Sequence, residues 1–305
     1  MTAPAFRALY ERLRSRAARA AVDGRPGALC HLTPERVAAA AAEVRLGRTV
    51  SLAAPIETMP GPDDPEPAVH RMTGPGPDDA GPDALRFATD RFAMNVHGDA
   101  DSHLDALCHV LFDGGLYGGV PASTVTPEGA RALSVDLLAD GLVGRGVLLD
   151  VPRLRGVRWL EPGDHVTLGD LTDAEAAQGV RAGPGDLLFV RTGHRLRRTE
   201  LGPWNAAEAR AGLHPTAVEF LADREVAALG GDGNNDTAPG AVADVAFPVH
   251  VLAIHALGIH LMDYLSFEDL APVCAETGRW SFLCAVAPLR LAGATGSPVN
   301  PVAVL

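Results

Sequence analysis

Apolar residues recur every three or four positions near the start of the chain. Phe6, Leu9, Tyr10 and Leu13 would lie on one face of a helix, with arginines on the opposite face. This spacing predicts an amphipathic helix over residues 5–21.

Further helices are predicted from their start signals. Thr33 is a capping residue and Pro34 follows at the first helical position, which predicts a helix to about Leu46, ended by Gly47. Another is predicted over 171–179. Its start resembles a capping box, in which Thr172 caps the helix and Glu175 stands three residues later. Two more helices are predicted over 214–224 and 248–258.

Short apolar runs bounded by glycine and other turn residues predict buried strands. These runs are residues 49–53, 144–151, 185–193, 226–232, 259–263 and a closing strand at 281–291. Residues 85–96 alternate and predict a strand or hairpin. Residues 59–83 are rich in Pro, Gly and Asp and predict a long loop, ordered over the functional site or at a subunit interface. Strands and helices alternate without a repeat, which indicates a mixed α/β fold.

Composition and charge bear on the number of domains, the kinds of partner and the location of the protein. The chain has 305 residues, 47% of them hydrophobic, and a net charge of -12. We expect one domain over 1–305, with residues 1–47 as a helical extension packed on it. The acidic balance argues against nucleic acid and anionic membranes as partners. Neither a spanning run of eighteen apolar residues nor a secretory signal is found, so we expect a cytoplasmic protein.

Two residue patterns bear on cofactors. The four cysteines have no CxxC spacing, and we expect reduced thiols; they are Cys30, Cys108, Cys274 and Cys284. No glycine-rich nucleotide-binding pattern follows any predicted strand, so nucleotide cofactors are not expected.

The candidate chemistry lies in residues 95–119. Six imidazole and carboxylate groups fall close together there: His97, Asp99, Asp101, His103, Asp105 and His109. On a strand, the i, i+2 pair His103 and Asp105 points to one face. His109 lies four residues after Asp105 and would return to the same spot if a helix or turn begins there. Imidazole and carboxylate together suit Zn²⁺, Mn²⁺ or Fe²⁺.

The segment from Ser102 to His109 resembles the Thr-His-x-Asp-x-x-x-His signature of the metal-dependent cyclase family, which includes bacterial kynurenine formamidase and isatin hydrolase. The resemblance implies that His103 and Asp105 are metal ligands and that His109 is the catalytic acid/base. The family's leading histidine position is Asp99 here, while a histidine stands two residues earlier, at His97. Either residue is a candidate for the first ligand.

Downstream blocks extend the resemblance over residues 40–305. The family's later metal-site pair, a His followed about twelve residues on by a Glu, maps to His250 and Asp263, which the resemblance implies as further metal ligands. The resemblance also implies a swivelling β/β/α domain, a mixed sheet with surrounding helices, a Mn²⁺ or Zn²⁺ ion, a small-molecule substrate, and a homodimer or homotetramer.

The remaining polar residues receive weaker assignments. His255 is expected at the helix surface or at the helix C-terminus, and His260 in a structural role. Asp232 and Asp236 are expected in a turn rather than at the metal. Spacing alone does not decide whether His194 and His214 line the pocket or only support the fold. His31, His70 and His165 are expected at the surface.

We expect a metal-dependent hydrolase of an amide, lactam or ester carbonyl. A bound divalent ion would acidify a water toward a pKa of about 7, and His109 would carry its proton to the leaving nitrogen. The alternatives are a cyclase or dehydratase that removes a proton beside a carbonyl, and a non-catalytic binding protein.

Overall fold

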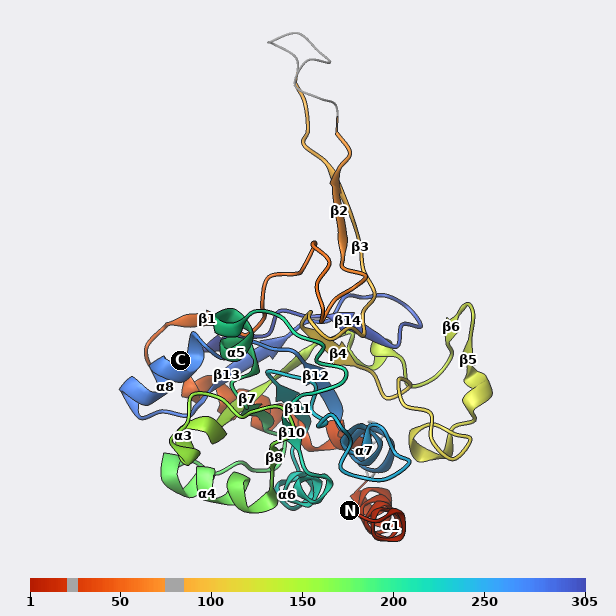
Figure 1. Cartoon of the computed structure of the whole chain (residues 1–305), viewed down its shortest axis with the longest axis vertical. Coiled ribbons are helices and arrows are strands. Elements are labelled where there is room, and N and C mark those ends of the chain that lie inside the picture. The colour runs from red at the N-terminus through yellow and green to blue at the C-terminus, as the bar shows by residue number, and fades with distance from the viewer. Residues whose placement is uncertain (21–26, 75–84) are drawn as a thin grey trace.

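The computed structural model describes residues 1–20, 27–74 and 85–305. A curled, nine-stranded mixed sheet forms the body, helices surround it, and a two-stranded arm projects from it (Figure 1). The predicted α/β class, a mixed sheet with surrounding helices, is therefore confirmed. No helix in these described ranges is both long and apolar enough to cross a membrane.

The large sheet has the order β1-β15-β13-β7-β9-β11-β12-β4-β14. Its strands are β1 (Thr49–Ser51), β4 (His103–Asp105), β7 (Leu142–Asp150), β9 (Leu187–Arg191), β11 (Ala228–Gly231), β12 (His260–Asp263), β13 (Ser281–Val286), β14 (Gly296–Pro298) and β15 (Val302–Val304). The neighbours from β7 to β12 pair in parallel, and the other pairs are antiparallel. Parallel strands covered on both faces are almost wholly apolar, which explains the runs seen in the sequence.

Other strands form two-stranded pairs outside the large sheet. These are β2 (Val69–Met72) with β3 (Asp90–Ala93), β5 (Val125–Thr126) with β6 (Gly129–Ala130), and β8 (His165–Val166) with β10 (Gly212–Leu213). The helices are α1 (Ala3–Ala20), α2 (Pro34–Ala40), α3 (Val151–Arg155), α4 (Leu168–Gln178), α5 (His194–Leu201), α6 (Val218–Arg224), α7 (Pro248–His250) and α8 (Leu270–Thr277). The π-helical segment η7 (Val251–Leu257) continues α7. Short 3₁₀ turns are η1 (Gly27–His31), η2 (Ala41–Glu43), η3 (Tyr117–Gly119), η4 (Ala122–Thr124), η5 (Val135–Leu138) and η6 (Pro215–Ala217).

Two apolar layers lie on opposite faces of the sheet. The face of α1 predicted to be apolar is buried: Phe6, Leu9, Tyr10 and Leu13 are each at most 2% exposed. These side chains belong to the same layer as η7. The N-terminal helix therefore covers the helix that carries His250.

Several predicted boundaries need correction. Thr33 caps α2 as predicted, but the helical segment ends with η2 at Glu43, short of Leu46. The capping box predicted at Thr172 is wrong: α4 begins earlier, and Thr167 with Asp170 forms the box.

The predicted closing strand at 281–291 is shorter and does not close the sheet. β13 ends at Val286, close to Pro288, and β14 and β15 follow it. Proline has no N–H to donate to a neighbouring strand, which is consistent with the end of the ladder there.

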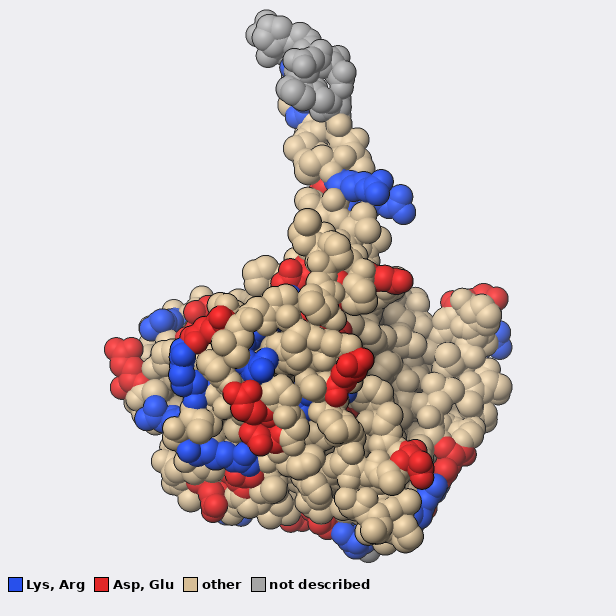
Figure 2. Space-filling model, in the orientation of Figure 1, with Lys and Arg blue, Asp and Glu red and all other residues tan. Residues whose placement is uncertain are grey.

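The arm corrects the prediction for residues 59–83. β2 lies inside that segment and pairs antiparallel with β3, the strand predicted within 85–96. All eight residues of the two strands are exposed, and the arm stands out from the body as a narrow stalk (Figure 2). Residues 75–84 of the predicted loop lie outside the described residues. The arm leads directly into the segment that carries His97.

Candidate metal centre

Two neighbouring strands near one edge of the sheet carry the candidate ligands. β4 and β12 pair antiparallel, with Asp263 opposite His103. Because side chains alternate along a strand, His103, Asp105 and Asp263 share one face. Leu104 and Met262 point to the other face, where both are buried in an apolar layer. The predicted i, i+2 pair therefore lies on a strand, as the sequence indicated.

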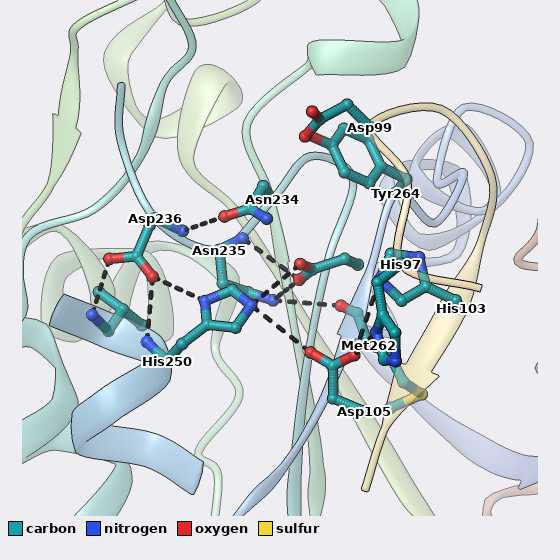
Figure 3. A network of polar contacts seen from close by, with 12 residues as sticks. His97, Asp99, His103, Asp105, Asn234, Asn235, Asp236, His250, Met262 and Tyr264 are labelled. Carbon is teal, nitrogen blue, oxygen red and sulfur yellow. Dashed lines mark hydrogen bonds and ion pairs between the residues drawn. The ribbon is translucent and has the colours of Figure 1, made fainter. Parts of the chain in front are cut away.

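Asp105 lies at the centre of the cluster and is 1% exposed. Its Oδ1 is 2.8 Å from His97 Nδ1 and 3.7 Å from His103 Nε2. Its Oδ2 is 3.5 Å from His250 Nε2, yet it accepts no hydrogen bond from the described residues (Figure 3). This leaves a buried carboxylate oxygen unsatisfied.

The His250 ring is held between two carboxylates. Its Nε2 is 3.3 Å from Asp263 Oδ2, and its Nδ1 is 2.7 Å from Asp236 Oδ2. Asp236 also accepts the backbone N–H groups of Val249 and His250, at 2.7 and 3.0 Å. Such a carboxylate behind an imidazole fixes its orientation, so Nε2 stays directed at the acidic groups.

Asp263 accepts hydrogen bonds from Asn235 through one of its two carboxylate oxygens. Asn235 donates to its Oδ1 through both the backbone N–H and the side-chain amide. The other oxygen, Oδ2, is buried and receives no hydrogen bond in the described part of the chain. Two unsatisfied carboxylate oxygens, on Asp105 and Asp263, thus occur in the same cluster.

His97 and His109 complete the cluster on the other side of Asp105. Their rings stack, with centroids 3.8 Å apart and planes inclined by 14°. His109 lies in a turn just after β4, where its N–H donates to the Ala106 carbonyl at 3.0 Å. His109 therefore lies near Asp105, as predicted.

The cluster fits a divalent transition metal. Ligand atoms of His97, Asp105 and His109 lie within 4.8 Å of one another, as do those of His103, Asp105 and Asp263. Imidazole nitrogen and carboxylate oxygen suit Zn²⁺ and Mn²⁺. A cation would also satisfy the two buried carboxylate oxygens, which lie near His250 Nε2 but accept no hydrogen bond from the described residues.

The two candidates for the first ligand lie in different surroundings. His97 contacts Asp105 directly, whereas Asp99 belongs to neither group of clustered ligand atoms. Asp99 instead accepts a hydrogen bond from the Tyr264 hydroxyl, and its Oδ1 is 3.8 Å from Arg210 Nη1. The geometry favours His97 over Asp99.

Burial and neighbouring charges shift the pKa values of several groups in the cluster. Burial opposes ionisation of Asp105, but His250 and His97 outweigh it and hold the pKa of that carboxyl well below its usual range. Burial disfavours the charged His250 ring, yet Asp263 and the other carboxylates raise its pKa well above the ordinary value. Burial lowers the pKa of His109 to about 4, so its imidazole is neutral at pH 7.

The cluster forms part of the wall of a cavity of about 550 Å³. Apolar side chains from two loops, including Leu111 and Phe247, line another part of it. A small molecule inside would therefore contact apolar groups on one side and the metal ligands on another.

The other histidines separate into clear environments. His255 was expected at the helix surface or at the helix C-terminus. It lies in the last turn of η7 but is buried, and its Nδ1 is 3.0 Å from the Tyr10 hydroxyl. His260 is fully buried, consistent with its structural assignment. His194 packs against Trp204 with ring centroids 4.7 Å apart, and His214 caps η6.

The three histidines expected at the surface differ. His70 is exposed on β2, whereas His31 and His165 are half-buried. The surface prediction is therefore confirmed for His70, and the other two are partly exposed.

Asp232 and Asp236 are more than turn residues. Both are fully buried. Asp232 accepts backbone N–H groups of Thr192, Gly193 and His194, whereas Asp236 contacts His250. The role of Asp236 was missed; the available signal was a carboxylate at the end of a buried strand in a short Gly-Asn-Asn-Asp segment.

Comparisons with known proteins agree with this architecture. The family model described as "Putative cyclase" matches residues 28–235. The solved structure of a novel cyclase is 32% identical, with a TM-score of 0.82, and the match covers 97% of this chain and 99% of that one. A search of curated proteins found no match.

More distant solved structures share the fold. An isatin hydrolase bound to the product analogue thioisatinate is 19% identical, with a TM-score of 0.58 over 87% of this chain and 94% of that one. Isatin hydrolase A from Ralstonia solanacearum is 24% identical, with a TM-score of 0.59 over 89% and 97%. A predicted metal-dependent hydrolase from Bacillus stearothermophilus is 20% identical, with a TM-score of 0.50 over 84% and 97%. Since the family model matches more than half of the chain and the 32% identical cyclase aligns over nearly all of it, the chain belongs to this cyclase family and shares its fold with isatin hydrolases.

Proposed function

We propose that this chain is a metal-dependent hydrolase that acts on an amide, lactam or ester carbonyl of a small molecule. The observation that supports it best is the pair of unsatisfied carboxylate oxygens, on Asp105 and Asp263, beside imidazoles in a substrate-sized cavity. His97, His103, Asp105, His250 and Asp263 would hold a Zn²⁺ or Mn²⁺ ion. Such an ion supplies Lewis acidity that polarises a carbonyl and makes a water easier to deprotonate.

His109 is the proposed acid/base. Its neutral imidazole can accept a proton from water and pass it to the leaving nitrogen or oxygen. The water oxygen joins the carbonyl carbon, the bond from that carbon to the leaving atom breaks, and the two water protons end on the products. Asp236 keeps the His250 ring oriented and takes no part in proton transfer.

The same cavity supports a second reaction class. A neutral imidazole beside a metal-polarised carbonyl can remove a neighbouring proton, which leads to cyclisation or dehydration. Product mass separates the two: hydrolysis adds one water, and cyclising dehydration removes one. A non-catalytic binding protein would show neither change.

The experiment that tests the proposal measures metal and turnover together. Purified protein is stripped of metal, reloaded with Mn²⁺ or Zn²⁺, and incubated with a panel of amides, lactams and esters. Metal-dependent gain of one water supports hydrolysis. Retained activity after complete metal removal would reject the proposal.

We also propose a cytoplasmic homodimer or homotetramer that takes a small-molecule substrate and binds neither nucleic acid nor membranes. The exposed side chains of Met72 and Phe92 on the arm support self-association, because an isolated hairpin is only marginally stable in water. Light scattering on the eluting protein gives the mass that decides between monomer and oligomer.

A further inference from the structure

Part of the cavity wall, outside the metal cluster, has no role in the proposed reaction. Most of that wall is apolar and is formed by Val110, Leu111, Phe112, Val245, Phe247 and Val251. The polar side chains beyond the metal cluster are Asp99, Asn234 and Asp244. Among the described residues that line the cavity, none is Lys or Arg. A carboxylate or sulfonate on a substrate would therefore meet acidic groups without a counter-ion on the cavity wall.

Tyr264 and Arg210 fix the position of the Asp99 side chain. The Tyr264 hydroxyl donates to its Oδ1, and Arg210 Nη1 lies 3.8 Å from the same oxygen. Both neighbours are fixed, because Tyr264 is fully buried and Arg210 is 2% exposed. The Arg210 guanidinium also donates to the carbonyl groups of Ala206 and Asp236, at 2.8 and 3.0 Å. The position of the Asp99 carboxylate is therefore set by the scaffold.

The second oxygen of Asp99 remains available. No hydrogen bond to its Oδ2 is found among the described residues, and the Asp99 side chain keeps 31% of its surface exposed. The residue lies against the Tyr264 ring (Figure 3), and it lines the same cavity as His97 and His109. A carboxylate that Tyr264 holds in place, and whose second oxygen receives no hydrogen bond from the described residues, is thus part of the wall of the cavity that contains the metal cluster.

We propose that Asp99 is a specificity-determining residue whose Oδ2 accepts the N–H of the substrate, so that the site selects uncharged, largely apolar amides or lactams with a free N–H. This inference rests on the proposed hydrolase function. Asp99 takes no proton in the reaction, in which the C–N bond breaks and water supplies the oxygen and the protons. An ester, a lactone or an N-methylated lactam would leave the Asp99 oxygen unpaired.

The predicted preference can be measured with three probes. Isatin carries a lactam N–H, N-methylisatin lacks it, and isatin-5-sulfonate adds a negative charge. For a hydrogen bond to a charged acceptor, we expect kcat/KM of the Mn²⁺-loaded protein to favour isatin over N-methylisatin by about 10-fold to 100-fold. The sulfonate should also be at least about 10-fold poorer than isatin.

Two variants separate recognition from folding. Asp99→Ala should lower kcat/KM for isatin by a larger factor than for N-methylisatin and bring the ratio between the two close to one. Tyr264→Phe, which removes the hydrogen bond to Asp99, should reduce the ratio partially. Asp223→Ala is the matched control, since Asp223 pairs with Arg16 on the exposed surface. Metal content and melting temperature are measured on every variant.

The outcomes are distinct. Equal loss with both probes in Asp99→Ala would make Asp99 a scaffold residue and overturn the inference, as would the absence of a preference in the parent. If neither probe is hydrolysed, calorimetric binding to the metal-loaded parent replaces turnover, and the same ratios apply. Preferred binding of isatin without hydrolysis would support the role of Asp99 and show that isatin is not a substrate, whereas equal binding of isatin and N-methylisatin would overturn the inference.

Discussion

Replacing Asp236 with Asn should weaken metal binding without touching a proposed ligand. Asp236 accepts three hydrogen bonds, from Val249 N, His250 N and His250 Nδ1, all in a buried setting. An amide in its place keeps one acceptor oxygen but presents an NH₂ group to donors. The His250 ring would then lose the carboxylate that fixes its tautomer and orientation.

The magnitude follows from these contacts. Loss of the partner behind a ligating or near-ligating imidazole typically reduces metal affinity by about 10-fold to 100-fold, or about 1.4–2.7 kcal/mol. One lost hydrogen bond to a charged group in the interior costs about 2–3 kcal/mol of folding free energy. For a chain of this size we expect Tm to fall by roughly 5 °C.

The assay is a calorimetric titration of metal-free protein with Zn²⁺ or Mn²⁺, together with thermal unfolding of the metal-free form. Asp232→Asn is the matched control. Asp232 is also fully buried and also accepts several N–H groups, but they come from Thr192, Gly193 and His194. The control should lose stability and keep its metal affinity. The reasoning is refuted if Asp236→Asn loses stability like the control yet binds metal as tightly as the parent.

Three further predictions concern single histidines. His103→Ala should purify with far less metal than the parent, and equal metal content in both proteins would remove His103 from the ligand set. His109→Asn should lower kcat by about 100-fold or more while leaving metal content and substrate affinity nearly unchanged, and loss of metal with activity would make His109 a ligand. Burial lowers the pKa of His260 to about 4, below its unfolded value of about 6.5, so the unfolded state binds more protons between these pH values and stability falls as pH drops through that window. This group contributes at most about 3 kcal/mol, and urea unfolding of His260→Leu should show a weaker pH dependence than the parent; an identical dependence would contradict the assignment.

Local rules predicted much of the secondary structure. The central strands are buried on both faces, so their apolar runs are unambiguous, and the i, i+2 spacing of His103 and Asp105 carries directly into β4. The start of α4 was predicted wrongly because two possible capping boxes lie close together in the sequence. Thr167 with Asp170 and Thr172 with Glu175 both read as capping boxes, and only tertiary packing selects the first.

The remaining misses depend on contacts between distant segments. His255 has helix-surface spacing, but α1 packs over it and brings Tyr10 within hydrogen-bond distance. Asp236 resembles a turn residue until α7 places His250 beside it. The short strand β2 is hidden in a segment rich in Pro and Gly, because its partner lies across that segment in β3. Pairing at a distance leaves no local signal in the sequence.

The position of β4 bears on when the protein can acquire its metal during biosynthesis. Among the described strands β4 pairs with β12 and β14, and both are made long after it as the chain leaves the ribosome. Until those strands emerge, no partner holds His103 and Asp105 on a common face, and Asp263 does not yet exist. Incomplete chains therefore lack the assembled site. Stoichiometric metal uptake becomes a chemical readout of finished synthesis and folding, and a chain truncated before β12 should show none.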